Sequence, residues 1–242
     1  MYGTNQVAGV DQREDGTLNV NSIWFTIQGE GPDAGRPAIF MRLAKCNLRC
    51  WFCDTEFESG ELRSASDLLE QIKGLSSEHG CNFVVMTGGE PLLQNIVPLV
   101  KLLNGWNIFV QVETAGTVYC EGLDEVFHAE RTYRGNLIVC SPKTPKLNER
   151  LVPLIGAFKY VVKANEMDPE DGLPVMSTQL NGEEARIFRP TLMQRITIPV
   201  YLQPCDENDP MANMENAKAA AAACMKHGHR LSIQTHKIAG VP

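Results

Sequence analysis

Short apolar runs alternate with amphipathic segments along most of the chain. Many of these runs are rich in β-branched residues and stay apolar over consecutive positions, which is typical of strands covered on both faces. They predict eight strands, at residues 22–27, 38–43, 82–87, 107–113, 136–141, 158–164, 198–203 and 230–235. Strands separated by helices predict an α/β fold with a mostly parallel sheet, either open or rolled into a full or partial (β/α) barrel.

Three of the intervening segments carry helix signals. Ser64 precedes an apolar face and is followed three residues later by an acidic side chain, as in a capping box. Pro91 suits the first turn of a helix that runs to about Asn104. Asn213 is the predicted N-cap of an alanine-rich helix that stops at Gly228.

Two segments fit this alternation poorly. Residues 164–197 are acidic and turn-rich, so we interpret them as an irregular insertion. Residues 1–20 are polar and predict no element, so we treat them as an N-terminal extension. We expect the whole chain, residues 1–242, to form a single domain.

Unusual polar stretches follow seven of the apolar runs. In parallel α/β folds the loops after the strands meet at one rim, where ligands bind. We therefore expect a composite ligand site. The seven stretches are "QGEG" (28–31), the cysteine loop (46–53), "TGGEP" (87–91), "ETAG" (113–116), "SPK" (141–143), "QPCD" (203–206) and "QTHK" (234–237).

Charge and hydropathy narrow the possible functions. The formal net charge is −7 and no basic stretch is present, which argues against nucleic-acid binding. The sequence has no apolar run long enough to cross a bilayer and no basic-then-apolar leader. We expect a cytoplasmic protein that does not bind membranes.

Five of the eight cysteines are scattered through the sequence. In a chain of this length they predict small, buried core residues rather than disulfides. Cys205 follows a strand at the expected rim, which leaves a redox-active role open for it. The five are Cys81, Cys120, Cys140, Cys205 and Cys224.

The other three cysteines, Cys46, Cys50 and Cys53, form a C-x₃-C-x₂-C pattern. A structural zinc ion needs a fourth ligand, yet no second C-x₂-C pair is present and no histidine stands at a matching spacing. A [4Fe–4S] cluster held by three thiolates keeps one iron open for a cofactor or substrate. The pattern favours the cluster, with zinc as the alternative.

The cysteine spacing, with Phe52 directly before the last cysteine, resembles the signature of radical S-adenosylmethionine (SAM) enzymes. The "GGEP" stretch at residues 88–91 resembles the second motif of that superfamily, where glycines permit close backbone approach and a carboxylate can accept from an ammonium group. In these enzymes the open iron chelates SAM, and one electron cleaves it to a radical that abstracts hydrogen. Without this resemblance, several of the expected SAM contacts would be interpreted as ordinary solvated loop residues. The expected SAM contacts are Phe52, Asp54, Gly89, Glu90, Glu113, Ser141, Lys143 and Gln203.

Over residues 22–242 the sequence resembles one family of that superfamily, the 7-carboxy-7-deazaguanine synthases. The matching stretches include "FTIQGEG", "AIFMRLAKCNLRCWFCDTEF", "VVMTGGEPLLQ", "VETAGT", "CSPK", "YLQP" and "LSIQTHK". The resemblance implies contraction of 6-carboxy-5,6,7,8-tetrahydropterin to 7-carboxy-7-deazaguanine with loss of ammonia, in queuosine biosynthesis. It also implies a requirement for Mg²⁺, catalytic use of SAM, an electron donor such as flavodoxin, and a homodimer.

The expected pterin contacts match the chemistry of a guanine-like edge and a carboxylate. Gln28 offers a donor and an acceptor together, and Glu30 accepts from ring N–H groups. Arg42 carries a planar fork that suits a carboxylate. An ion pair for Arg42 and an ordinary turn for the two others remain alternatives. The full expected set is Ile27, Gln28, Gly29, Glu30, Arg42, Thr87, His236 and Pro242.

Two further expectations concern Mg²⁺ and the last residues. The resemblance implies that the Thr55 hydroxyl ligates Mg²⁺, although Asp54 would be the more obvious ligand from chemistry alone. The final residues, 238–242, are apolar, so we expect them to fold back over the site and bring the Pro242 carboxylate to the pterin. A disordered tail is the alternative.

Two other functional classes remain open at this point. A glycyl-radical activating enzyme would share the cluster and SAM but would act on a protein and give no reason for "QGEG" or "QTHK". A non-enzymatic iron–sulfur or zinc protein would instead hold a coordinatively closed metal.

Overall fold

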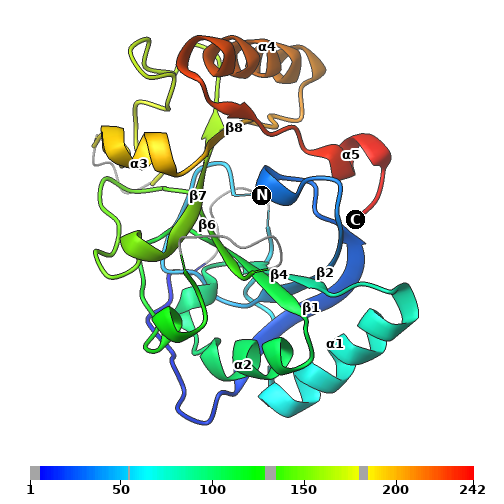
Figure 1. The fold of residues 1–242 in the computed structure, drawn as a ribbon. Helices are drawn as coiled ribbons and strands as arrows, with labels where there is room; N and C mark the ends of the chain where they lie inside the picture. Colours follow the sequence, from blue (N-terminus) through cyan, green and yellow to red (C-terminus); the bar gives the residue numbers. More distant parts are fainter. Residues whose placement is uncertain (1–5, 54, 129–134, 180–184) are drawn as a thin grey trace.

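The computed structural model describes residues 6–53, 55–128, 135–179 and 185–242, and within them the chain forms one nine-stranded sheet (Figure 1). The strand order is β3-β1-β2-β4-β5-β6-β7-β8-β9. The strands are β1 Leu18–Ile27, β2 Pro37–Leu43, β3 Glu61–Arg63, β4 Phe83–Gly88, β5 Phe109–Thr114, β6 Leu137–Cys140, β7 Ile155–Val162, β8 Val200–Pro204 and β9 Arg230–Leu231.

The sheet is parallel from β2 to β9, which confirms the predicted mostly parallel α/β fold. Within the described residues β3 and β9 end the strand order, so the sheet is not closed into a full barrel. At the first edge, β1 pairs antiparallel with both β2 and β3. The connection from β1 to β2 spans residues 28–36, which is too short for the crossover that parallel strands need.

The N-terminal strand is longer than predicted. β1 begins at Leu18, inside the segment for which the sequence predicted no element. Leu18 is fully buried and Val20 nearly so, and the backbone N–H of Asn19 donates to the Gln94 side chain at 2.6 Å. The prediction missed residues 18–21 because their strand character depends on partners more than 20 residues away.

Five α-helices lie between or after the strands in the described residues. Ser64 caps α1 as predicted, since its side chain accepts from the Asp67 N–H. No described helix is long and apolar enough to cross a membrane. The helices are α1 Ala65–His79, α2 Val97–Gly105, α3 Leu192–Thr197, α4 Pro210–His227 and α5 Thr235–Ala239.

The helix predicted from Pro91 is wrong at its start. Pro91–Leu93 forms a short 3₁₀ turn, and α2 begins only at Val97. Between them Gln94 is extended, and its buried amide donates to the backbone oxygens of Asn19 and Ala44. These distant bonds outweigh the local preference for a continuous helix.

The cap predicted for the alanine-rich helix is also wrong. Asp209, not Asn213, caps α4, because its carboxylate accepts from the N–H groups of Met211 and Ala212. Pro210 occupies the first helical position, where its missing N–H is harmless.

The C-terminal half departs from regular alternation. Residues 164–191 form isolated bridges rather than strands within the described ranges, and α3 closes the segment. The last predicted strand is shorter than expected, because β9 covers only Arg230–Leu231 and the chain turns into α5 at Thr235.

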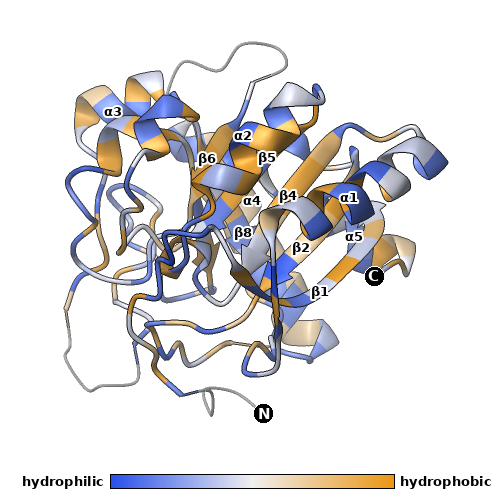
Figure 2. Cartoon of the chain, turned by 90° about the horizontal axis from the view of Figure 1, so that it is seen from below, coloured by the Kyte–Doolittle hydropathy of each residue, from blue (hydrophilic) through white to orange (hydrophobic). Residues whose placement is uncertain are grey.

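Helices pack against the sheet towards both ends of the strand order, where α1 contacts β2 and α4 contacts β8. Figure 1 shows α1 and α2 together on one side of the molecule and α4 on the other. Hydrophobic residues concentrate on strands such as β2 and β4, whereas α1 is largely hydrophilic (Figure 2). The five scattered cysteines are all buried, as predicted.

Candidate active site

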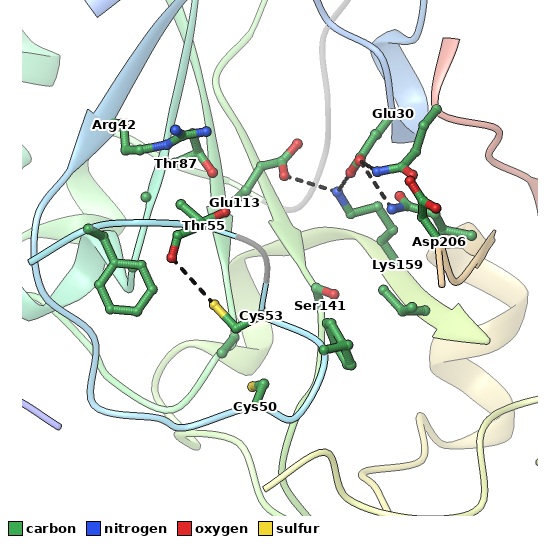
Figure 3. Close-up of a pocket in the computed structure, with 18 of the residues that line it drawn as sticks. Glu30, Arg42, Cys50, Cys53, Thr55, Thr87, Glu113, Ser141, Lys159 and Asp206 are labelled. Atoms are coloured by element: carbon green, nitrogen blue, oxygen red, sulfur yellow. Dashed lines mark hydrogen bonds and ion pairs between the residues drawn. The ribbon is translucent and has the colours of Figure 1, made fainter. Parts of the chain in front are cut away.

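All seven polar stretches that follow the strands reach one cavity of about 350 Å³ (Figure 3). Each contributes at least one lining residue. This volume lies within the range of small-molecule sites. The rim expected from the sequence is therefore a single composite pocket, with cysteines on one wall and carboxylates on another.

The three clustered cysteines all line this cavity. Cys46 is buried, whereas Cys50 and Cys53 are half-buried. Burial raises the pKa of the Cys46 thiol to about 12. Their loop is anchored by its ends: the Lys45 N–H donates to the Phe57 oxygen at 2.7 Å.

The donor set fits a cluster better than a single ion. Among the described residues no three His, Cys, Asp or Glu side chains gather as ligands of one metal ion, which a structural zinc would require. Three thiols facing one cavity match the irons of a [4Fe–4S] cluster, which sit apart from one another.

The two glycines of the second motif bring β4 against the cysteine loop. A side chain on Gly89 would place its Cβ 1.9 Å from the Lys45 oxygen, and one on Gly88 would lie 2.1 Å from the Leu43 oxygen. Gly88 also has a φ of 138°. Glycine is therefore needed at both positions for backbone packing beside the cysteines.

Glu90 holds strand ends together. It is fully buried, and its carboxylate accepts from the Thr114 hydroxyl at 2.6 Å and from the N–H groups of Ala115 (2.7 Å) and Leu92 (3.1 Å). Burial raises its pKa. It is not among the lining residues, so its expected SAM contact remains a prediction that this placement does not support.

The lining includes polar groups suited to a zwitterionic ligand. Lys143 donates to the Ser141 hydroxyl and lies 5.2 Å from the centre of the Phe52 ring, and burial lowers the Lys143 pKa. The Gln203 Oε1 atom is buried with no hydrogen-bond partner, while its Nε2 donates to Glu30. A buried acceptor without a donor fits a ligand hydroxyl or N–H group, such as those of SAM.

A buried triad of charges forms the opposite wall. The Lys159 ammonium contacts a carboxylate oxygen of Glu30 at 2.5 Å and one of Glu113 at 2.9 Å, and its side chain is only 5 % exposed. Burial opposes ionisation of Glu30, but the adjacent Lys159 charge prevails and lowers its pKa to about 2. Burial likewise opposes the Lys159 charge, but Glu113 and Glu30 raise its pKa above the usual value.

Glutamine side chains fix the two carboxylates. Gln28 donates to Glu113 at 2.9 Å and accepts from the Glu30 N–H at 3.0 Å. Gln111 also donates to Glu113, and Gln234 donates to Glu30 at 2.7 Å. The triad and its glutamines form a pre-organised polar wall before any ligand binds.

The sequence predicted Glu30, Glu113 and Gln28 but missed Lys159 and Gln234. The one available signal for Lys159 was its charge within the otherwise apolar stretch at residues 158–162. A charge in a buried strand calls for a buried partner. Gln234 opens the "QTHK" stretch, of which only His236 was singled out.

The last residues lie at the mouth of the cavity. A Cβ on Gly29 would lie 1.7 Å from the His236 ring, so glycine is required for this packing. The Thr235 N–H donates to the Gly29 oxygen, and the Thr26 hydroxyl donates to the Pro242 oxygen at 2.6 Å. His236 and Pro242 both line the cavity.

Of the remaining predicted residues, four line the cavity and one lies outside the described residues. Arg42 lies 5.0 Å from the Trp24 ring centre and lines the cavity, as do Ile27, Thr87 and Thr55. Asp54 lies outside the described residues.

Cys205 also lines the cavity, but burial raises its pKa to about 11, which keeps it a thiol near neutral pH. The redox-active role left open for Cys205 therefore gains no support.

Comparisons with known proteins agree with this geometry. Residues 42–164, about half of the chain, match the Radical SAM superfamily. A 7-carboxy-7-deazaguanine synthase of Rhodospirillum rubrum is 42 % identical over 98 % of each chain. A 7-carboxy-7-deazaguanine synthase of Rickettsia prowazekii is 37 % identical over 100 % of this chain and 96 % of its own. The crystal structure of QueE from Escherichia coli has the same fold, with a TM-score of 0.64 at 22 % identity over 90 % of this chain and 94 % of its own.

Proposed function

The chain belongs to the 7-carboxy-7-deazaguanine synthase family of the radical SAM superfamily, and on that premise we propose that it converts 6-carboxy-5,6,7,8-tetrahydropterin to 7-carboxy-7-deazaguanine with release of ammonia. The observation that carries the proposal is one cavity shared by three cysteines and a wall of buried carboxylates. The reaction belongs to queuosine biosynthesis. The glycyl-radical activating alternative is not favoured, because near-full-length relatives carry the name of the small-molecule enzyme.

The cysteine wall holds the cofactors. We assign the thiolates of Cys46, Cys50 and Cys53 as ligands of a [4Fe–4S] cluster, and Gln203 and Lys143 as contacts of SAM. When bound, the cluster and SAM together supply the one-electron chemistry that abstracts a hydrogen atom from substrate. The protein's own part is to fix both cofactors beside the carboxylate wall and to leave one iron without a protein ligand.

The carboxylate wall orients the pterin. Lys159 pairs with Glu30 and Glu113, and both carboxylates present acceptors to the N–H groups of a guanine-like edge. Gln28 and Gln234 hold these carboxylates in place, so little reorganisation is needed when substrate enters. We assign Arg42, which lies at the end of β2 and lines the cavity, to pair with the substrate carboxylate.

The residues at the mouth restrict access to the bound pterin. His236 packs over Gly29, and Pro242 is held by Thr26. We assign Ile27, Thr87, His236 and the Pro242 carboxylate to substrate binding. Covering the pterin in this way excludes water, which strengthens each charge–dipole contact in the site.

We also propose that Thr55 ligates Mg²⁺. Its hydroxyl belongs to a lining residue next to the cysteine loop, and Mg²⁺ typically takes few protein ligands together with substrate oxygens and water. A flavodoxin-type electron donor and a homodimeric state belong to the same proposal. Reduction of the cluster by flavodoxin tests the electron donor. Size-exclusion chromatography tests the homodimeric state.

The experiment that tests the function is anaerobic turnover. The reconstituted protein is incubated with the carboxytetrahydropterin, SAM, Mg²⁺ and a reductant, and the products are analysed by mass spectrometry. We expect a product lighter than the substrate by one ammonia, formed over many turnovers. A reconstituted, SAM-cleaving protein that leaves the pterin unchanged would refute the proposed substrate.

A further inference from the structure

A short segment distant in the sequence, residues 177–179, lies directly against the cysteine loop. The Trp51 N–H donates to the Thr178 oxygen at 3.1 Å, and Cys50 and Gln179 form an isolated antiparallel bridge. The segment belongs to the irregular stretch 164–197, for which no functional role was predicted. We call residues 177–179 the strap.

The strap is anchored on its other side to the loop that carries Lys143. The Lys143 backbone oxygen accepts from the Thr178 N–H at 3.1 Å and from the Ser177 hydroxyl at 3.0 Å. The strap thus joins the cysteine loop to the proposed SAM-binding loop, and its position is fixed from both sides.

Two strap side chains donate hydrogen bonds to one sulfur. The Thr178 hydroxyl lies 3.2 Å from Cys50 Sγ, and the Gln179 Nε2 lies 3.3 Å from the same atom. The Gln179 amide is oriented by its other end, since its Oε1 accepts from the Arg49 N–H at 3.0 Å. Thr178 is 7 % exposed, so its hydroxyl is shielded from water.

The Thr178 hydroxyl has a second acceptor within reach, the Lys143 oxygen at 3.3 Å. A metal-bound thiolate carries negative charge, and hydrogen bonds to charged acceptors are stronger than those to neutral ones. Once the thiolate forms, the Cys50 sulfur is therefore the preferred acceptor.

Hydrogen bonds to cysteine sulfur are one of the factors that set the reduction potential of an iron–sulfur cluster. A donor stabilises the extra negative charge of the reduced state more than the oxidised state. We propose that Thr178 and Gln179 are positioning residues that raise the reduction potential of the cluster through Cys50. The inference rests on the proposed function, because it presupposes the cluster.

The step concerned is one-electron reduction of the cluster by an external low-potential donor, with no bond made or broken. Easier reduction helps a donor of limited driving force to load the electron. It equally lowers the driving force for reducing SAM, so the strap sets a balance between these two steps.

The test is an anaerobic potentiometric titration of the reconstituted full chain, with the reduced cluster followed by EPR. Thr178→Val removes the hydroxyl at nearly constant shape, and Gln179→Met removes the amide at similar length without adding charge. We expect each change to lower the ratio of reduced to oxidised cluster at a given solution potential about three- to tenfold. A tenfold change equals about 59 mV for a one-electron couple.

Two matched variants serve as controls. Thr178→Ser keeps the hydroxyl and should restore the original potential. Ser177→Ala removes a strap hydroxyl that bonds to Lys143 and should leave the potential unchanged. A purely structural strap would instead give similar effects for Ser177→Ala and Thr178→Val.

The outcomes separate this inference from the proposed function. Should Thr178→Val bind less iron, the potential of Gln179→Met decides the matter. Unchanged potentials in the substituted proteins at full iron content would overturn the strap's role and leave the function intact. An unsubstituted protein that assembles no EPR-active cluster would overturn both.

Discussion

The two walls of the cavity are built differently. The cysteine wall is a loop, residues 46–53, whose buried thiol has a raised pKa and gains its charge only when metal binds. The carboxylate wall stands mainly on strands β5 and β7, and Lys159 already forms an ion pair with each of its two carboxylates. The cysteine wall becomes charged only when its cofactors bind, whereas the carboxylate wall has its ion pairs in place before the substrate binds. Changes to the first should therefore abolish chemistry at little cost in stability, and changes to the second should cost both.

The largest effect should follow from the cysteines. Replacing Cys46, Cys50 or Cys53 with Ala should remove the cluster and all measurable SAM cleavage. For the half-buried Cys50 the free energy of unfolding should fall by about 1 kcal/mol or less. Iron analysis and urea unfolding measure the two quantities. Cys140→Ala is the control. Because the Cys140 side chain is fully buried, this variant should lose about 1 kcal/mol of unfolding free energy, yet it should keep the iron and the activity of the protein.

Lys159→Met should show the opposite balance. It leaves Glu30 and Glu113 buried without their counter-charge, and breaking a buried pair in this way typically costs about 3–5 kcal/mol of unfolding free energy. Chemical denaturation measures it. Lys101→Met, which breaks the exposed pair with Glu125, should cost at most about 1 kcal/mol. Equal losses in the two variants would contradict the pre-organised wall.

The ionised Glu30 carboxylate should also make the free energy of unfolding depend on pH in the acidic range. The folded-state pKa of Glu30 is about 2, below its ordinary value of 4.5. Its stabilisation is therefore present above about pH 4.5 and lost as the pH falls towards 2. Glu30→Gln should flatten this part of the curve by a few kcal/mol, at about 1.4 kcal/mol per pKa unit. Denaturation at several pH values tests it, and parallel curves for both proteins would contradict it.

Thr55→Ala tests whether Mg²⁺ belongs to the site. We expect the Mg²⁺ concentration for half-maximal turnover to rise about tenfold or more, as is typical even for indirect metal partners. Iron content should not change, because the thiolates bind iron independently. Thr55→Ser keeps the hydroxyl and should behave like the original protein. A reaction that runs equally well in chelator would rule out a catalytic Mg²⁺.

The smallest effect should come from the mouth of the cavity. Thr26→Val removes the hydrogen bond to the Pro242 oxygen, which is worth about 1 kcal/mol. If this bond holds the tail over the pterin, the KM for the pterin should rise about fivefold. SAM binding should stay unchanged. Thr26→Ser should restore the KM, and an unaltered pterin KM in Thr26→Val would remove the tail from the account.

The contrast between the walls also explains what the sequence predicted well. The cysteine wall is encoded by three residues within eight positions, a spacing that carries its chemistry in one loop. The strands were found because burial on both faces gives continuous apolar runs. Their carboxyl ends then placed the seven polar stretches on one rim.

The carboxylate wall depends on pairings that no local pattern reveals. Lys159 meets Glu30 across 129 positions of the chain, and Gln179 meets Cys50 across the same number. The helix start at Val97 was missed for a similar reason, because Gln94 bonds to segments far away in the sequence. Local sequence patterns were therefore enough to predict which loops form the cavity. The charge pairs inside it could be identified only from the folded structure.

In the proposed function, one cavity joins a wall that binds the cofactors to a wall that binds the substrate. The most direct measurement records 5′-deoxyadenosine and pterin-derived product in the same anaerobic reaction for the unsubstituted protein, Cys50→Ala and Glu30→Gln. We predict that Cys50→Ala forms neither, and that Glu30→Gln still cleaves SAM but forms little product. Full product formation by Glu30→Gln, or SAM cleavage by Cys50→Ala, would contradict the account.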